Sequence, residues 1–509
     1  MGKFKKEPTI IVGNINCKLT GVSQVEAGVV AKAMKVRQPN YFFNSAYKKG
    51  LWDGYVKFFV RPANTFPTGL LPTVLNVLKD ELEIVPIIKD ERTNVEGFQV
   101  HSISENYQVS GEKTARDYQV EAYNALASNK VAGLTFQRGI LNLATNAGKT
   151  TIAIALIKEL YPKLVSRNRI FLFITHSKEI ANQTKAAIEK DLGIEVGYLG
   201  SGQWDVKPVC VAIVATMFRN ISADKFNDIS ERTVALVADE CHHCAAKTFL
   251  GTLNAFTNAS IRVGLTGTVD KKNIINEWNL YGATGEVLMR VSNDYLVTHG
   301  YSAKPVCIFL KITEPDVEGL GYHTEYQLGI EENDIRNQVI TRVCMKEVQA
   351  GHKVLILVEH MVQGQLILQE IENVNPDVKA YFTNGQLNNE LRQGLLDAMK
   401  GNMIDVLIAT SILDEGVDVS NINAVIYARG MKSSRKLLQG IGRGLRKKSD
   451  GSVLRFYDFI DDVSVHMLKH SKERATTLKN EGFNMKILDI DTYEGLTWEE
   501  INETNKHKQ

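Results

Sequence analysis

The octapeptide Leu143–Thr150, Leu-Ala-Thr-Asn-Ala-Gly-Lys-Thr, constrains the fold of this chain more than any other segment. It lies between an apolar run, residues 139–143, and a run with helical periodicity, residues 151–157. This order predicts a strand, a tight loop and the start of a helix, as a phosphate-binding loop requires. In such a loop, backbone N–H groups and the positive end of the helix dipole face one anion.

Each residue of this loop then has an expected role. We expect Lys149 to reach the outer phosphates of a nucleotide and the Thr150 hydroxyl to bind Mg²⁺. The whole set expected around the nucleotide is Thr145, Asn146, Ala147, Gly148, Lys149, Thr150 and Thr151. Leu143 and Asn146 stand where small residues or glycine are common, but both leave backbone amides available, so we expect altered affinity and retained hydrolysis. The alternative is a helix that merely begins with Gly-Lys-Thr.

Apolar runs alternate with helix-patterned runs along the rest of the chain, with a break near residues 293–303. The apolar runs are 170–174, 209–215, 234–238 and 261–265, then 306–310, 354–358, 378–382, 406–409, 424–427 and 454–456. Strands that alternate with helices form parallel sheets covered on both faces. We therefore predict an α/β protein with two parallel-sheet lobes, in which binding residues follow the carboxyl ends of strands.

Length and composition limit the number of domains, the kind of partner and the cellular compartment. A length of 509 residues corresponds to roughly three domains, because a single core rarely exceeds about 250–300 residues. A net charge of +2 indicates no partner, so any nucleic-acid signal must be local. Six scattered cysteines do not make a disulfide framework and favour a reducing compartment. The longest apolar run, 209–218, is about half as long as a membrane helix, so we expect a cytoplasmic protein without a membrane partner.

Residues 1–110 combine basic and aromatic side chains. Eleven lysines and arginines up to residue 61 are opposed by only three acidic residues. Residues 41–59 of this stretch include eight aromatic residues: Tyr41, Phe42, Phe43, Tyr47, Trp52, Tyr55, Phe58 and Phe59. Such a mixture can contact phosphate and stack on bases. The alternative is a small α+β domain with its aromatics in the core and its lysines in solvent, and residues 55–60 do alternate partly like a strand.

The sequence Asp-Glu-Cys-His-His-Cys, residues 239–244, follows the apolar run 234–238. As a zinc site it lacks a second ligand pair at zinc-finger spacing, and consecutive residues of a strand end point in different directions. As the end of a buried strand facing the phosphate loop, Asp239 would hold Mg²⁺ and Glu240 would orient and deprotonate an attacking water. His242 would then be a neutral coupling residue. We favour this second interpretation.

Two further segments carry candidate chemistry. Arg116-Asp117-Tyr118-Gln119 opens a helical pattern, and the Gln119 amide can both donate to and accept from an adenine edge. In Gln439–Arg446, Arg443 and Arg446 lie three residues apart and therefore near each other along a helix. Guanidinium groups suit the charge of a phosphoryl-transfer transition state and are typically worth about 10³–10⁵ in rate. The alternatives are an ordinary helix start and a basic, solvated helix.

Together and in this order, the segments resemble the motifs of the DExH-type superfamily 2 helicases across residues 116–446. Arg116–Gln119 resembles the adenine-reading motif, Ala144–Thr150 the Walker A loop, and Asp239–His242 the DExH box with cysteine as its third residue. The other matching segments are Thr175–Gln183, Ala215–Thr216, Leu265–Thr268, Val358–His360, Ile408–Ser411, Asp414–Asp418 and Gln439–Arg446. In the family, Leu265–Thr268 would link hydrolysis to movement.

This resemblance implies an ATP hydrolase with bound Mg²⁺, built from two RecA-like lobes. The first lobe would hold ATP through Lys149, Thr150 and Asp239, and the second would complete the site with Gly416, Asp418, Gln439, Arg443 and Arg446. The implied DNA contacts within the motor are Thr175, Gln183, Thr216, His360 and Thr410. The implied domains are an N-terminal DNA-binding domain at 1–110, lobes at 111–295 and 296–470, and a C-terminal helical tail at 471–509.

The flanking segments Tyr47–Gly54 and Phe66–Leu71 narrow the resemblance to helicases of phage recombination. This implies branch migration, fork regression and unwinding of D-loops or R-loops, with Lys48, Lys49 and Trp52 as further DNA contacts. Branched, forked, duplex or single-stranded DNA is the expected partner, and recombination or single-strand-binding proteins are candidate partners in a host cytoplasm. A double-stranded DNA translocase, an RNA helicase and a nucleic-acid-binding protein with a degenerate ATPase remain open as alternatives.

Overall fold

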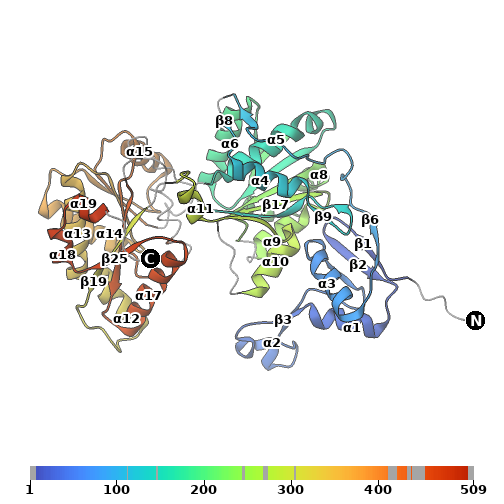
Figure 1. The fold of residues 1–509 in the computed structure, drawn as a ribbon, viewed down its shortest axis with the longest axis horizontal. Helices are drawn as coiled ribbons and strands as arrows, with labels where there is room; N and C mark the ends of the chain where they lie inside the picture. The colour runs from blue at the N-terminus through green and yellow to red at the C-terminus, as the bar shows by residue number, and fades with distance from the viewer. Residues whose placement is uncertain are drawn as a thin grey trace, which may run out of the picture. The chain divides into compact units, whose positions relative to one another are not determined.

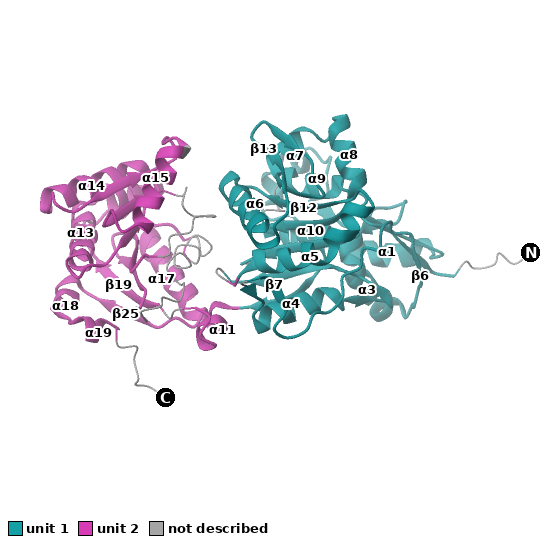
Figure 2. Cartoon of the chain, turned by 90° about the horizontal axis from the view of Figure 1, so that it is seen from above, with its two compact units in different colours: residues 1–144, 148–291 teal, residues 145–147, 292–509 magenta. Residues whose placement is uncertain are grey.

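The computed structural model describes residues 7–111, 113–144, 147–242, 247–267, 273–302, 305–410, 421–432, 437 and 453–502. The chain divides into two compact units (Figure 2). Unit 1 comprises residues 1–144 and 148–291, and unit 2 comprises residues 145–147 and 292–509. Within the described ranges, no helix combines the length and the apolar character needed to cross a membrane.

The N-terminal region of unit 1 is a small α+β structure. Its sheet has the order β5-β2-β1-β6, and two helices, α1 and α3, pack together. Their bounds are β1 Thr9–Val12, β2 Asn16–Thr20, β5 Thr65–Pro67, β6 Ile87–Asp90, α1 Gln24–Ala33 and α3 Leu71–Leu82, with the 3₁₀ turn η2 at Thr68–Leu70. Ser23 begins α1 with a capping box, since it accepts from the Glu26 N–H while the Glu26 carboxylate accepts from Ser23. The expected α+β texture of this region is thus observed.

A separate ribbon rises from this region between α1 and β5. Strands β3 (Lys35–Arg37) and β4 (Tyr55–Lys57) pair antiparallel. The 3₁₀ turn η1 (Tyr41–Phe43) and helix α2 (Ser45–Lys48) lie between them. Phe58 and Phe59, directly after β4, are buried in the core of the N-terminal region. The eight aromatic residues of this segment therefore divide into core residues and residues of the ribbon.

The N-terminal region packs firmly against the rest of unit 1. Phe58 meets Trp278 of α10 (Ile274–Thr284) edge to face, with ring centroids 5.2 Å apart. The buried guanidinium of Arg138 donates to the carbonyl of Asn14 at 2.9 Å and to that of Ala283 at 2.9 Å. At Gly69, an added Cβ would lie 1.8 Å from the Tyr281 carbonyl oxygen, so only glycine permits this close approach. These contacts hold the N-terminal sheet and the larger sheet of unit 1 as one body.

The larger sheet of unit 1 has eight strands in the order β14-β13-β15-β12-β16-β17-β11-β18, parallel except for β14. The strands are β11 Arg138–Leu143, β12 Ile170–Thr175, β13 Gly197–Gly200, β14 Gln203–Asp205, β15 Val209–Ile213, β16 Thr233–Asp239, β17 Ile261–Thr266 and β18 Val287–Val291. The helices are α4 Asp117–Ala127, α5 Lys149–Ser166, α6 Lys178–Leu192, α7 Val214–Arg219, α8 Asp224–Arg232, α9 Lys247–Ala255 and α10. Two short hairpins, β7–β8 (Gln108–Ser110, Lys113–Thr114) and β9–β10 (Lys130–Val131, Leu134–Thr135), complete this unit.

Helices cover this sheet on both sides (Figure 1). The central strands β12 and β16 are buried along their whole length, because both faces of the sheet are covered. This is why the corresponding segments read as unbroken apolar runs in the sequence. The predicted parallel sheet is confirmed. The strand bounds differ from the predicted apolar runs by one or two residues, for example at Val214, where the apolar run continues into α7.

Unit 2 contains a seven-stranded parallel sheet with the order β21-β22-β20-β23-β24-β19-β25. Its strands are β19 Val306–Ile312, β20 Val354–Leu357, β21 Ala380–Thr383, β22 Val406–Ala409, β23 Ala424–Tyr427, β24 Arg455–Asp461 and β25 Met485–Leu488. Its helices are α11 Asn293–Thr298, α12 Tyr322–Tyr326, α13 Asp334–Gln349, α14 Met361–Val374, α15 Asn389–Lys400, α17 Val465–Asn480, α18 Ile490–Gly495 and α19 Trp498–Asn502, with the π-helical turn η4 at Gln327–Glu331.

The carboxyl end of the chain differs from the expected helical tail at 471–509. Helix α17 runs through residue 471, and β25 then adds an edge strand beside β19. Only half-buried or exposed side chains line β25, because an edge strand is covered incompletely. Its sequence therefore lacks the apolar run that marked the central strands.

Candidate nucleotide-binding site

The phosphate loop connects β11 to α5, as the sequence predicted. Gly148 begins α5 with a left-handed φ of +75°, a conformation that glycine adopts without strain. Its carbonyl accepts a hydrogen bond from the Thr151 N–H at 2.9 Å. Ala147 is fully buried, whereas Thr150 is half-buried at the first turn of the helix. Thr145 and Asn146 lie outside the described residues.

Gln119 lies directly against this loop. Its Oε1 accepts from the backbone N–H of Arg116 at 3.0 Å, which fixes the side chain at the start of α4. A Cβ placed on Gly148 would lie 2.3 Å from Gln119 Nε2, so the amide nitrogen touches the glycine backbone. The Arg116 guanidinium donates to the Tyr118 hydroxyl at 2.9 Å. The adenine contact expected of Arg116 and Gln119 stays a prediction, and the structure brings Gln119 to the loop.

Lys149 lies between the two acidic residues at the end of β16. Its Nζ is 2.5 Å from Glu240 Oε1, and only 15% of each side chain is exposed. Burial disfavours the charge of Lys149, but Glu240 and Asp239 outweigh burial and raise the pKa of the ammonium group. Lys149 therefore carries a positive charge at the carboxyl end of the sheet, where an anionic phosphate would be attracted.

Asp239 has the character of a cation ligand. It is buried, and its Oδ1 has no hydrogen-bond partner within the described residues. Burial raises the pKa of Asp239 to about 6, with Lys149 acting against this rise. A buried carboxylate oxygen without a proton donor fits a hard divalent cation such as Mg²⁺, and the Thr150 hydroxyl is the second oxygen expected there.

Glu240 stands at the turn after β16, with a φ of +46° that is strained for a residue other than glycine. Burial opposes its ionisation, but Lys149 and His242 outweigh burial and hold the pKa of Glu240 far below its ordinary value. The carboxylate therefore stays ionised, and its oxygens can accept a hydrogen bond that orients a water molecule.

His242 links Glu240 to the next strand. Its Nδ1 lies 3.2 Å from Glu240 Oε2 and 2.9 Å from the Thr266 hydroxyl at the end of β17. The contacts identify Thr266 as a partner of His242, and the coupling role expected for His242 stays a prediction. Cys241, in contrast, points into the core, since a Cβ on Gly264 would lie 2.8 Å from its sulfur. His243 and Cys244 lie outside the described residues.

The expected nucleic-acid contacts of the motor differ in exposure. Gln183 on α6 is exposed and Thr216 on α7 is half-exposed. The side chain of His360, which precedes α14, is 57% exposed and contacts Glu331. Thr175 and Thr410 are both buried at strand ends, and the DNA contacts expected of their hydroxyls stay predictions.

In the N-terminal ribbon, Lys48 and Lys49 are exposed, as a phosphate contact requires. Trp52 is half-buried, and its indole N–H donates to the Tyr55 carbonyl at 2.9 Å. Its polar edge is therefore used inside the ribbon, and the DNA contact expected of Trp52 stays a prediction. Of the remaining predicted residues, Gly416, Asp418, Gln439, Arg443 and Arg446 lie outside the described residues.

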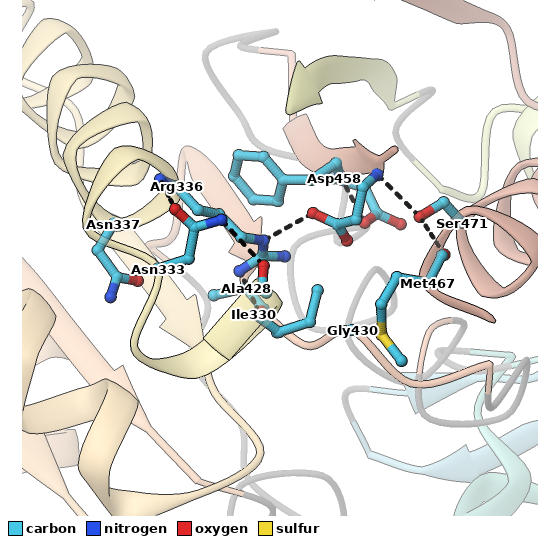
Figure 3. A network of polar contacts seen from close by, with 12 residues as sticks. Ile330, Asn333, Arg336, Asn337, Ala428, Gly430, Asp458, Met467 and Ser471 are labelled. Carbon is cyan, nitrogen blue, oxygen red and sulfur yellow. Dashed lines mark hydrogen bonds and ion pairs between the residues drawn. The ribbon is translucent and has the colours of Figure 1, made fainter. Parts of the chain in front are cut away.

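A buried charge network in unit 2 had no counterpart in the predictions (Figure 3). Arg336 of α13 donates to Asp461 at 2.7 Å and to the Ala428 carbonyl at 2.7 Å. Arg474 of α17 donates to Asp458 at 2.9 Å and to the Gly430 carbonyl at 3.1 Å. All four charged side chains are fully buried. The network fixes the backbone that follows β23, shortly before the segment Gln439–Arg446 in the sequence.

Two family models match the chain in succession. The model described as "Type III restriction enzyme, res subunit" matches residues 112–271, which include the phosphate loop and the segment 239–242. The model described as "Helicase conserved C-terminal domain" matches residues 336–448 in unit 2.

Individual proteins match over larger parts of the chain. The ATP-dependent DNA helicase UvsW of Enterobacteria phage T4 is 26% identical over 497 residues, which cover 88% of this chain and 93% of UvsW. The DNA 3'-5' translocase XPB2 of Sulfurisphaera tokodaii is 24% identical over 374 residues, which cover 67% of this chain and 80% of XPB2. Among solved structures, Dbp5 of S. cerevisiae bound to RNA and ADP BeF3 is similar in fold, with a TM-score of 0.53 and 14% identity over 74% of this chain and 90% of that one.

Proposed function

Because this chain belongs to the superfamily 2 helicases and hydrolyses ATP, as its motif order predicted and the family matches confirm, we propose that it is a motor acting on branched DNA. Its reactions would be branch migration, fork regression and the unwinding of D-loops or R-loops. The similarity to UvsW carries this proposal, because it extends over 88% of the chain and so includes much more than the two motor models.

The described residues of unit 1 supply the first half of the hydrolytic machinery. Lys149 holds the outer phosphates, and Glu240 orients the attacking water and accepts its proton. Thr150 and Asp239 would hold Mg²⁺, which neutralises charge on the phosphates when it is bound. Arg443 and Arg446 are proposed to stabilise the transition-state charge, with Gly416, Asp418 and Gln439 as further nucleotide contacts.

Movement would begin at the contact between His242 and Thr266. When Glu240 changes its interactions during hydrolysis, His242 transmits the change to the end of β17 through its 2.9 Å contact with the Thr266 hydroxyl. The exposed residues Gln183 and His360 and the half-exposed Thr216 are proposed to hold the DNA backbone. Contacts to phosphate carry no sequence information, so binding should be independent of sequence and steeply weakened by salt.

The ATPase rate across a panel of nucleic acids tests this function. The panel contains single-stranded, duplex, forked and four-way DNA and a forked RNA, each at the same concentration of phosphate groups. We expect forked and four-way DNA to give the highest rate, and strand displacement from forked DNA to require ATP. The Lys149→Ala variant controls for contaminating ATPase. Equal stimulation by all substrates would contradict a preference for branched DNA.

Two outcomes of the same panel would favour a different motor. Stimulation by duplex DNA without strand displacement would indicate a double-stranded DNA translocase, a reading that the similarity to XPB2 supports. Stimulation by RNA alone would indicate an RNA helicase, since Dbp5 shares the fold and was solved with RNA.

A further inference from the structure

The ribbon formed by residues 35–57, here called the knob, presents apolar side chains to solvent. Phe43 is 71% exposed, Phe42 49% and Leu51 78%. The rings of Phe42 and Phe43 lie side by side, with centroids 4.5 Å apart. Figure 1 shows α2 and β3 extending away from the N-terminal sheet, so these rings lie on a projecting part of unit 1. Two neighbouring exposed rings are an unusual feature for a surface and suggest a partner with flat faces.

The knob is held rigid by its own contacts. The Arg37 guanidinium lies over the Tyr41 ring at 4.1 Å, and the Tyr47 ring meets the Tyr41 ring edge to face at 4.7 Å. Gly54, with a φ of +80°, allows the same Tyr41 ring to approach, because an added Cβ would lie 2.9 Å from it. Tyr41 thus anchors the turn that carries Phe42 and Phe43. Rings fixed in advance lose little conformational entropy when they bind a partner.

Charge on the knob favours a polyanion. Its basic residues are Lys35, Arg37, Lys48, Lys49 and Lys57. Its single acidic residue, Asp53, is already paired with Lys57 at 2.8 Å. Lysines beside exposed aromatic rings combine phosphate attraction with base stacking, which is the pattern of single-strand nucleic-acid binding sites.

The knob is also fixed to the ATP-binding part of unit 1. Phe58, which directly follows β4, is buried and packs on Trp278 of α10. Its backbone N–H donates to the Met34 carbonyl, the residue before β3, at 2.9 Å. The knob is therefore attached to the core of the N-terminal region at both of its ends, before β3 and after β4. A displacement of unit 1 along DNA would carry the knob with it.

We propose that the tip of the knob binds unpaired bases at a DNA branch point, with the rings of Phe42 and Phe43 stacking on them and Lys48 and Lys49 holding the adjacent phosphates. The inference rests on the proposed action on branched DNA and adds the element that recognises the junction. Each branch point exposes base faces that a continuous duplex hides, so the knob distinguishes forked from duplex DNA.

The test uses full-length protein and a forked DNA with 2-aminopurine as its first unpaired base, read by fluorescence. Phe42→Ala/Phe43→Ala should weaken fork binding by roughly 5–150-fold, the range found when one base loses an aromatic partner, and should remove the 2-aminopurine signal. Phe42→Leu/Phe43→Leu should weaken it similarly, because leucine keeps the apolar surface but has no ring face. Phe43→Trp should retain binding and the signal. Val85→Ala, at an apolar residue that is 87% exposed outside the knob, is the matched control.

The outcomes separate this inference from the proposed function. If the unchanged protein unwinds forks but both double variants bind them as tightly, the knob has another occupant, such as an apolar protein surface, and the inference is wrong. If only the leucine variant binds normally, the tip acts through apolar contact without stacking, which also overturns it. If forked and duplex DNA stimulate the ATPase of the unchanged protein equally, the proposed function itself fails. Circular dichroism of every variant checks that these exposed substitutions leave the fold intact.

Discussion

Replacing Arg474 by methionine should destabilise unit 2 strongly. The Arg474 side chain is fully buried, and its guanidinium donates to Asp458, to the carbonyls of Gly430 and Phe459 and to the Ser471 hydroxyl. Methionine has a similar length but offers no donor, so the buried carboxylate of Asp458 would lose its cation. Removing one partner of a buried ion pair typically costs about 3–5 kcal/mol, because the remaining charge is left uncompensated.

Hydrogen exchange measures this loss where it occurs. Every 1.4 kcal/mol is tenfold, so we expect amides of β24 and α17 to exchange roughly 10²–10⁴-fold faster in Arg474→Met than in the unchanged protein. Burial already raises the pKa of Asp458 despite Arg474, and the variant should raise it further. A raised carboxyl pKa removes stability as pH rises, so the loss should be smaller at pH 5 than at pH 8.

Arg342→Met is the matched control in the same unit. Arg342 makes two short contacts with Glu494, at 2.7 and 2.6 Å, but its side chain is 44% exposed. Exposed pairs contribute about 0–1 kcal/mol, so its exchange should change less than about tenfold. Equal exchange in the two variants, or a change below tenfold in Arg474→Met, would refute the reasoning from burial.

Three further predictions concern the nucleotide site and the pH response. Lys149→Ala and Arg443→Ala should each lower DNA-stimulated ATP hydrolysis by at least about 10³-fold in a coupled ATPase assay, with the circular dichroism spectrum unchanged. Hydrolysis that survives both changes would contradict the assigned roles of these residues in the ATPase. Gly148→Ala should weaken ATP binding by roughly tenfold in calorimetry, because the left-handed φ of +75° is strained for alanine and its Cβ would strike Gln119; an unchanged affinity would contradict this. Burial opposes ionisation of Glu347, but hydrogen bonds from His352 and Arg455 outweigh it and lower its pKa, so unit 2 should lose stability as pH falls below the ordinary glutamate value of about 4.5. Glu347→Gln should flatten that dependence in denaturation curves at pH 3–7, and an unchanged slope would contradict it.

The central strands and the order of motifs could be predicted from the sequence for a physical reason. A parallel strand covered on both faces must be apolar throughout, so segments such as 170–174 and 406–409 stand out without any alignment. Edge strands such as β14 and β25 could not be recognised in this way, because they are partly exposed to solvent and therefore lack a continuous apolar sequence. Two polar residues at strand ends that were expected to contact DNA, Thr175 and Thr410, are buried, which their sequence positions alone did not indicate.

Long-range partners explain the remaining differences. Arg474 lies in a charged segment that is typical of a solvated helix, and only the fold brings its guanidinium to Asp458 inside the core. Arg138 likewise precedes an apolar run without any signal that it would bind the carbonyl of Asn14, far away in the sequence. Such pairs depend on how sheets and helices come together, which local periodicity does not encode. The candidate ATP site was predictable because its chemistry requires fixed residues at fixed spacing.

A series of contacts within unit 1 connects the candidate ATP site to the knob. Glu240 touches His242, and His242 touches Thr266 at the end of β17. Helix α10 packs against β17, and its Trp278 packs on Phe58 at the base of the knob. A change at Glu240 therefore has a packed route to the N-terminal region that needs no residue of unit 2. On this view, the N-terminal region is a part of the motor and not an appended DNA anchor, because its core shares Phe136 and Ile275 with the ATP-binding lobe.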